Sequence, residues 1–129
     1  MGTRFVCSTE CTAHLNFKEM IVKSKDRSAI VTGRSTGHPV RVIKNKFTRE
    51  FLELEKNGAD VKQLEELGAG RLRLAVVEGD VDNGSVMAGQ ISGLVNDIKP
   101  CSHIIQDIIQ EALDQFERLT SLKGGKLDG

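Results

Sequence analysis

The hydrophobic residues of this chain occur in short groups that polar and glycine-containing stretches separate. Two of these groups are rich in β-favouring residues and short enough for strands, which predicts extended structure at residues 4–8 and 28–32. The group at residues 40–43 fits either a strand or the start of the next helix. The pattern thus predicts few strands and leaves most of the chain for helices.

Hydrophobic residues spaced three and four apart predict a helix over residues 17–24. Asn16 is its expected N-cap, with Glu19 in the position of a capping box. The same spacing, with start and stop signals, predicts three further helices. These are a charged helix around Phe47, Phe51 and Leu54 that stops at Asn57-Gly58, a helix opened by Asp60 with Gln63 and interrupted at Gly68, and a continuation from Leu72 to Gly79.

A turn-rich loop follows at residues 80–84, and Ser85 is placed to cap a helix over residues 86–95. Gly89 and Gly93 are four apart on that predicted helix, which leaves one side without side chains. Each glycine lowers the stability of a helix by about 1 kcal/mol relative to alanine, so the presence of two glycines here requires an explanation. Close packing against a sheet and close approach to a ligand both remain open.

Beyond Pro100, Ser102 is the expected cap of the longest helix. Its apolar positions form a wide stripe that something must cover. The stripe consists of Ile104, Ile105, Ile108, Ile109, Ala112, Phe116 and Leu119. Residues 123–129 are expected to be a flexible tail.

Composition excludes several classes of function. The 129 residues carry 18 basic and 18 acidic side chains and neither Trp nor Tyr, so a nucleic-acid partner is not expected. No apolar run approaches the ~20 residues that cross a bilayer, and the first residues lack the pattern of a signal peptide, so a cytoplasmic protein without a membrane partner is expected. Cys7, Cys11 and His14 lie close together in sequence, but a structural zinc site needs a fourth ligand, so no metal is expected.

No set of residues in the chain forms a complete catalytic site. His14 and His103 lie beside predicted helix starts, where structural roles suffice. His38 lies in a loop rich in Gly, Ser and Thr, between Arg34 and Arg41, which makes it the best of the three histidines for contact with an anionic ligand.

Three motifs follow one another along the chain: GTRF at Gly2–Phe5, VTGRSTGHPVR at Val31–Arg41 and DNGSVMAGQ at Asp82–Gln90. In this order they resemble the C-terminal part of the flavin-dependent enoyl-acyl-carrier-protein reductases, close relatives of the nitronate monooxygenases (2-nitropropane dioxygenases). The resemblance runs from residue 1 to about residue 116 and covers only the last part of a family member. The GSVM residues of the third motif favour enoyl reduction over nitronate oxidation.

The resemblance implies an α/β fold: the C-terminal fragment of a (β/α)8 TIM barrel with an inserted, mainly helical lobe, so that this piece is helix-rich. The expected parts of this single partial domain are the last barrel strand and following helix at 1–27, the inserted lobe at 28–80, the C-terminal barrel helices at 81–122 and the tail at 123–129. The remaining barrel strands are expected from outside this chain, as its partner. A homodimer is left open.

The resemblance also implies a site. Met1, Gly2 and Thr3 are expected at the FMN phosphate, Gly89 and Gln90 near the flavin, and Ser85, Met87 and His38 at the substrate, an enoyl thioester of acyl-carrier protein that NADH or NADPH reduces through FMN. The family's proton donor is an upstream histidine whose motif none of the three histidines here matches, so no catalytic residue is expected and the chain alone is expected to be inactive. Nitronate oxidation and an inactive folding or interaction module are the alternatives.

Overall fold

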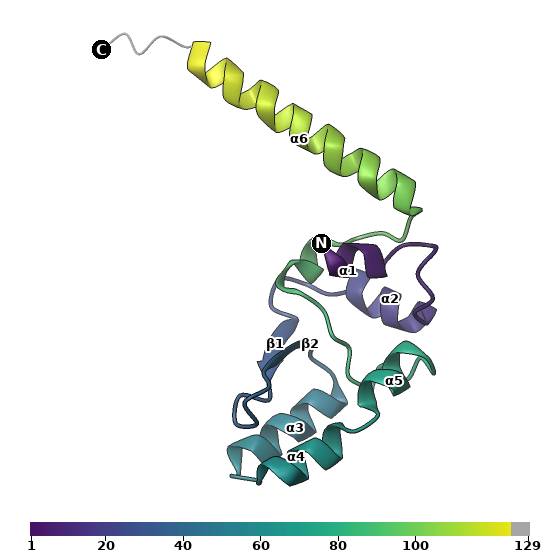
Figure 1. The fold of residues 1–129 in the computed structure, drawn as a ribbon, viewed down its shortest axis with the longest axis vertical. Coiled ribbons are helices and arrows are strands. Elements are labelled where there is room, and N and C mark those ends of the chain that lie inside the picture. Colours follow the sequence, from purple (N-terminus) through teal and green to yellow (C-terminus); the bar gives the residue numbers. More distant parts are fainter. Residues whose placement is uncertain (125–129) are drawn as a thin grey trace, which may run out of the picture.

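The structure is a computed structural model that describes residues 1–124. It is mixed α/β and rich in helix, as expected, and these residues form no closed barrel (Figure 1). The elements in chain order are α1 (Gly2–Val6), α2 (Leu15–Val22), β1 (Ala29–Thr32), β2 (Val40–Ile43), α3 (Lys46–Lys56), α4 (Val61–Gly68), α5 (Arg71–Val76), the 3-10 helix η1 (Gln90–Leu94) and α6 (Cys101–Gly124).

The first element differs from the prediction, because residues 4–8 do not form a strand. The Met1 carbonyl accepts hydrogen bonds from the amides of Arg4 at 3.0 Å and Phe5 at 3.3 Å, so the chain turns into the short helix α1. Ser8 alone pairs in strand fashion, with Lys99. A run of five residues carries too little periodicity to separate a strand from one helical turn.

Helix α2 lies where it was predicted but has a different cap. Its N-cap is His14, whose Nδ1 accepts a hydrogen bond of 3.1 Å from the amide of Asn16. The Asn16 side chain instead donates to the carbonyl of Gly79 at 3.0 Å, which ties the start of α2 to the turn after α5.

The two strands form an antiparallel hairpin, with Ala29 opposite Ile43 and Thr32 opposite Val40. Residues 40–43 are therefore extended, which resolves the alternative that the sequence left open. Gly33 turns the chain with φ of +74°, and a Cβ there would lie 2.9 Å from the carbonyl oxygen of His38. The hairpin connection thus depends on this glycine.

The helices α3, α4 and α5 confirm the predictions for residues 45–79. Capping boxes begin α3, between Asn45 and Thr48, and α4, between Asp60 and Gln63. Phe47 and Phe51 of α3 form a small core with α4. A second core lies between α1, α2, β2, α5 and the segment after residue 84.

The prediction of a helix over residues 86–95 is wrong. Ser85 to Ala88 run extended beside β2, where the amide of Ile43 donates to the Val86 carbonyl at 2.9 Å and the amide of Ala88 to the Arg41 carbonyl at 3.2 Å. Only η1 is helical in this stretch. Backbone partners on β2 replace the hydrogen bonds that a helix would have formed.

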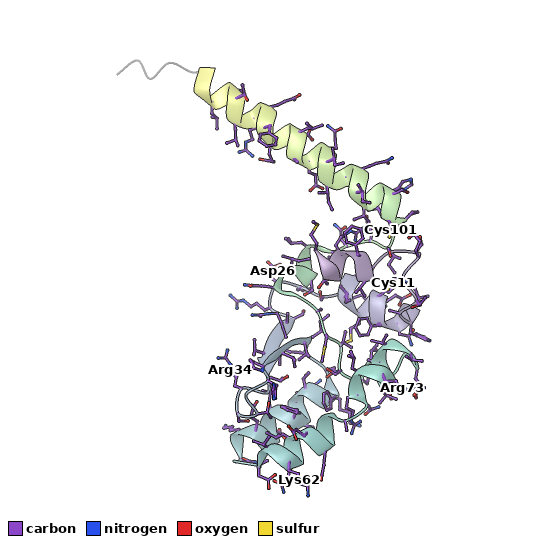
Figure 2. The ribbon with its side chains drawn as sticks, viewed as in Figure 1. Cys11, Asp26, Arg34, Lys62, Arg73 and Cys101 are labelled. Carbon is purple, nitrogen blue, oxygen red and sulfur yellow. The ribbon has the colours of Figure 1, made fainter. Side chains whose placement is uncertain are left out.

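Helix α6 begins at Cys101, one residue before its expected cap, and the Cys101 amide donates to both carboxylate oxygens of Glu10 at 3.0 Å. Of its apolar stripe Ile104 is buried, whereas most of the remaining large apolar residues are exposed. The helix projects away from the rest of the chain, with its side chains extending on all sides (Figures 1 and 2). No helix within residues 1–124 is long and apolar enough to cross a membrane. Of the predicted tail, residues 125–129 lie outside the described residues.

Candidate functional site

The extended segment Ser85–Ala88 divides its side chains between two environments. Val86 and Ala88 are buried in the larger core, whereas Ser85 and Met87 face a cavity on the other side. Successive side chains of an extended chain point to opposite faces, so residues two apart share one face. The predicted helix would not have placed Ser85 and Met87 together in this way.

The cavity that Ser85 and Met87 line, here called the lobe cavity, has a volume of about 320 Å³. It lies between the β1–β2 hairpin, helices α3 to α5 and the extended segment, and its lining is mainly apolar. The apolar part consists of Val40, Phe47, Phe51, Leu64, Leu72 and Met87. His38 lies at the same cavity, so the structure brings together the three residues expected at the substrate.

Ser85 and Thr32 are the buried polar residues of this wall. Ser85 is 6% exposed, and its hydroxyl takes part in none of the hydrogen bonds that the structure shows among residues 1–124. The amide of Ser85 donates to the carbonyl of Arg71 at 2.8 Å, which fixes the backbone against α5. The hydroxyl is therefore held at the cavity and is available to a bound molecule.

The loop that carries His38 is held against α3. Glu55 accepts hydrogen bonds from the amide and the hydroxyl of Ser35 at 2.9 and 2.7 Å. Partial burial raises the pKa of Glu55, but these hydrogen bonds from the loop outweigh burial and leave the pKa below its ordinary value. Thr36 Oγ1 closes the turn by accepting from the His38 amide at 3.2 Å. Arg34 lies at the outer edge of this turn (Figure 2), and His38 itself is exposed.

A hydrogen bond joins two motifs that are 86 residues apart: the amide of Gly89 donates to Thr3 Oγ1 at 2.8 Å. A Cβ at Gly89 would lie 3.1 Å from that oxygen. The reasoning that placed Gly89 and Gly93 on one helix face is therefore wrong, since Gly89 precedes η1 and faces Thr3. Gly93 instead allows the turn at Asp26 to approach, where a Cβ would meet the Asp26 amide nitrogen at 2.7 Å.

The first turn of α1 has the properties that a phosphate needs. No side chain caps the helix, and nothing lies within 4 Å of a Cβ built at Gly2. The first amides of a helix have no partner within the helix, so those of Gly2 and Thr3 are available to an anion. Met1 and Gln90 are exposed. The residues present therefore fit the FMN phosphate that the resemblance implies.

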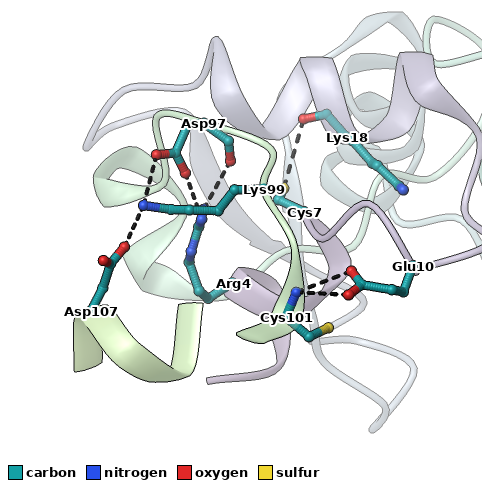
Figure 3. A network of polar contacts seen from close by, with 8 residues as sticks. All are labelled: Arg4, Cys7, Glu10, Lys18, Asp97, Lys99, Cys101 and Asp107. Carbon is teal, nitrogen blue, oxygen red and sulfur yellow. Dashed lines mark hydrogen bonds and ion pairs between the residues drawn. The ribbon is translucent and has the colours of Figure 1, made fainter. Parts of the chain in front are cut away.

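A charged network that the sequence did not predict links α1 to α6 (Figure 3). Arg4 donates to the carbonyl and the carboxylate of Asp97 at 2.8 and 2.5 Å, and Lys99 joins Asp97, at 3.1 Å, to Asp107. Hydrogen bonds to Asp107 and Asp97 raise the pKa of Lys99. These residues border a second cavity of about 470 Å³ between α1, η1 and α6.

The cysteines and histidines outside the lobe have structural surroundings. Cys7 is buried, burial raises the pKa of its thiol, and its Sγ lies 3.8 Å from the Lys18 carbonyl. His14 caps α2, and His103 is exposed on α6. Among residues 1–124, no group of three or more His, Cys, Asp or Glu side chains is placed to hold a metal ion.

Comparison with known proteins identifies the family. The family model for nitronate monooxygenase matches residues 1–111. A probable nitronate monooxygenase of Staphylococcus aureus is 28% identical over 86% of this chain and 31% of its own length. A 5-hydroxy-7a-methyl-1-oxo-octahydro-1H-indene-4-carboxyl-CoA dehydrogenase of Mycobacterium tuberculosis is 21% identical over 95% of this chain and 45% of its own length.

Among solved structures, FabK from Thermotoga maritima aligns with a TM-score of 0.89 and 46% identity, over 95% of this chain and 39% of that protein. The chain thus spans less than half the length of these relatives. The resemblance inferred from the three motifs is confirmed. Because the family model covers most of its length, the chain belongs to the nitronate monooxygenase family.

Proposed function

We propose that this chain is the C-terminal part of an FMN-dependent enoyl-acyl-carrier-protein reductase. The observation that carries the proposal is the likeness to FabK, an enoyl-acyl-carrier-protein reductase, at 46% identity and a TM-score of 0.89. The probable nitronate monooxygenase is 28% identical. Nitronate oxidation is the second candidate, supported by the family model.

In this proposal the first turn of α1 holds the FMN phosphate. The amides of Gly2 and Thr3 donate to its oxygens, with Met1 on the same turn, and the Gly89 amide keeps the Thr3 side chain in place. Gln90 follows Gly89 directly and is exposed. FMN, when bound, supplies hydride transfer from NADH or NADPH, while the protein binds and orients the reactants.

The substrate in this proposal is an enoyl thioester of acyl-carrier protein at the lobe cavity. Ser85, Met87 and His38 line this cavity. Met87 lies two residues before Gly89, whose amide donates a hydrogen bond to Thr3. The indene-carboxyl-CoA dehydrogenase supports a thioester, since the name of that relative specifies one. Ligand pockets of about 300–1,000 Å³ with a few polar groups are typical of small-molecule sites, and the lobe cavity of about 320 Å³ falls in that range.

In this proposal, the rest of a (β/α)8 barrel packs against the apolar face of α6. Large apolar residues on this helix are exposed, including Phe116 at 67%. The alignment with FabK extends over 95% of this chain and 39% of FabK, so FabK contains further structure that this chain lacks. The remaining part of such a protein can bury the stripe.

The proposal is tested on the full-length protein that contains this chain. Oxidation of NADH or NADPH that depends on a trans-2-enoyl thioester is expected, together with FMN released on denaturation. Oxygen consumption with an alkyl nitronate, without enoyl reduction, would favour the second candidate. A purified protein that binds no flavin would favour an inactive folding or interaction module instead.

A further inference from the structure

The lobe cavity is open although apolar side chains surround it. Phe47, Phe51 and Leu64 form the small core of the lobe, and all three also line the cavity. The cavity, of about 320 Å³, is open to solvent on one side, so its apolar walls form a groove that a hydrocarbon chain can enter and cover.

Gly68 is the residue of α4 that leaves the cavity open. It is helical and has no positive φ, and a Cβ there would meet only the Phe51 Cε2 atom, at 4.0 Å. Gly33, by contrast, has a positive φ and a carbonyl oxygen 2.9 Å from the position of a Cβ. Neither the backbone conformation nor a close neighbour requires glycine at position 68. The structure offers one reason for a glycine here, which is the space that the missing side chain leaves at the cavity.

The cavity wall also contains hydroxyl groups, those of Ser85 and Thr32, that suit a ligand oxygen. Ser85 is 94% buried, since 6% of it is exposed, and its hydroxyl has no partner among residues 1–124. The fully buried side-chain oxygens without a partner among residues 1–124 are those of Ser24 and Ser92, so the Ser85 oxygen keeps access to the cavity, where a ligand oxygen can form a hydrogen bond with it. A linear hydrocarbon chain that ends in a carbonyl group matches both the apolar walls and the hydroxyl.

The cavity lies close in sequence to the proposed flavin segment, because its lining residue Met87 is two residues before Gly89. Gly89 is bonded to Thr3, and Met87 and then Ser85 follow along the extended chain at steps of about 7 Å. The Ser85 amide donates to the carbonyl of Arg71 at the start of α5. The lining of the cavity extends from Met87 and Ser85 to the junction of α4 and α5, where Gly68 lies.

We propose that the lobe cavity holds the hydrocarbon tail of the acyl thioester and that Phe51, Leu64 and Gly68 limit the length of tail that the protein accepts. This inference rests on the proposed function and adds the determinant of chain length to it. Each methylene group that leaves water strengthens binding by about fourfold. Filling the cavity therefore weakens the binding of long-chain substrates by tenfold or more and leaves the binding of short-chain substrates nearly unchanged.

The decisive variant is Gly68→Leu in the full-length holoenzyme, because its side chain enters the cavity beside Phe51. Initial rates are measured with trans-2-butenoyl and trans-2-decenoyl thioesters. We expect kcat/KM for decenoyl thioester to fall at least tenfold, mainly through KM, and that for butenoyl thioester to stay within about twofold. Glu66→Leu adds the same side chain two residues away, on the opposite side of α4, and should change neither.

Calorimetric binding of saturated decanoyl and butanoyl thioesters to the same variants provides a readout without turnover. If wild-type protein reduces no enoyl thioester but binds decanoyl thioester, and Gly68→Leu abolishes that binding, the proposed function fails and the tail site stands. Parallel loss of both chain lengths in Gly68→Leu, or no loss, would overturn the tail site. If the leucine variant does not fold, Gly68→Ala replaces it in the test, because it adds one methyl group at an open position. We then expect a smaller loss of affinity, confined to decanoyl thioester.

Discussion

At the scale of single residues, a buried lysine holds the connection between α1 and α2. Lys18 is 6% exposed, and its Nζ donates to the carbonyl oxygens of Ser8 and Cys11, both at 2.6 Å. Burial of a charge is tolerated only where such hydrogen bonds replace water. The loop therefore depends on this ammonium group for its conformation.

Replacing Lys18 by methionine keeps the length of the side chain and leaves both carbonyls without their donor. The free energy of unfolding should fall by roughly 2–4 kcal/mol, measured by urea denaturation. Two hydrogen bonds from a charged donor, at about 1.5–3 kcal/mol each, are lost, and the desolvation cost of the buried ammonium, which methionine avoids, offsets part of that loss. Lys23→Met is the matched control, since Lys23 is exposed and, among residues 1–124, pairs with Glu19 alone, and its effect should stay below about 1 kcal/mol. Equal stabilities of the two variants would show that Lys18 is not a support of the loop.

A second residue-scale prediction concerns the proposed phosphate contact. Gly2→Val in the full-length protein places a branched side chain where the phosphate approaches, and the loss of one charge-assisted hydrogen bond should weaken FMN binding about tenfold or more. Nothing lies within 4 Å of a Cβ at Gly2, so folding should be unaffected. An unchanged dissociation constant for FMN, measured by flavin fluorescence, would remove Gly2 from the site.

At the scale of elements, the extended conformation of Ser85–Ala88 predicts opposite outcomes for adjacent residues. Val86 is fully buried in the core and Met87 is 39% exposed at the cavity. Val86→Ala should lower the free energy of unfolding by roughly 1–3 kcal/mol, whereas Met87→Ala should cost less than about 1 kcal/mol. Thermal denaturation measures both. A larger loss for Met87→Ala than for Val86→Ala would contradict the alternation of side chains.

The charged network at α6 predicts a pH dependence. Burial raises the pKa of Asp97, but hydrogen bonds from Lys99 and Arg4 outweigh it, so the pKa lies below the ordinary 3.8. The folded state thus favours the charged carboxylate, and its contribution to stability is present above pH 3.8 and lost as the pH falls through the lower, folded-state pKa.

The measurement compares the free energies of unfolding of wild type and Asp97→Asn across this range. The free energy of unfolding of the wild type should exceed that of Asp97→Asn by a constant amount near neutral pH, and this difference should shrink below pH 3.8. It should also be small and decrease with added salt, because Asp97 is 46% exposed. An advantage that grows on acidification would contradict the assigned direction.

At the scale of the whole molecule, the projecting helix α6 decides how the chain behaves in solution. Ile109 is 57% and Phe116 67% exposed on a helix that contacts the rest of the described chain mainly near its start. Exposed apolar patches of this kind mark surfaces that another protein part covers. The full-length protein is expected to bury them, whereas the 129-residue chain alone is not.

The isolated chain should therefore self-associate, and the double variant Ile109→Gln and Phe116→Gln should remain monomeric under the same conditions in analytical ultracentrifugation. In the full-length protein the same double variant should instead lower the melting temperature, because both residues would lose burial against the barrel. A melting temperature equal to that of the wild type would show that the barrel does not cover this face of α6.

The helices of the lobe could be predicted because their signals are local. The start signal at Asp60 with Gln63 and the apolar spacing around Phe51 involve residues at most a few positions apart, and such signals act before any tertiary contact forms. The three motifs likewise sufficed to recognise the family. The assignment of individual residues to flavin and substrate stays a prediction.

Tertiary contacts decided most of the rest. Sequence alone predicted a helix at residues 86–95 and a strand at residues 4–8, and both predictions are wrong. For the first segment β2 supplies backbone partners, whereas in the second the Met1 carbonyl accepts local helical hydrogen bonds from Arg4 and Phe5. The lobe cavity with Ser85 and Met87 on one face follows from that same pairing with β2. Local propensity fixes an element only where no distant partner offers the backbone better hydrogen bonds, and at this site distant partners do.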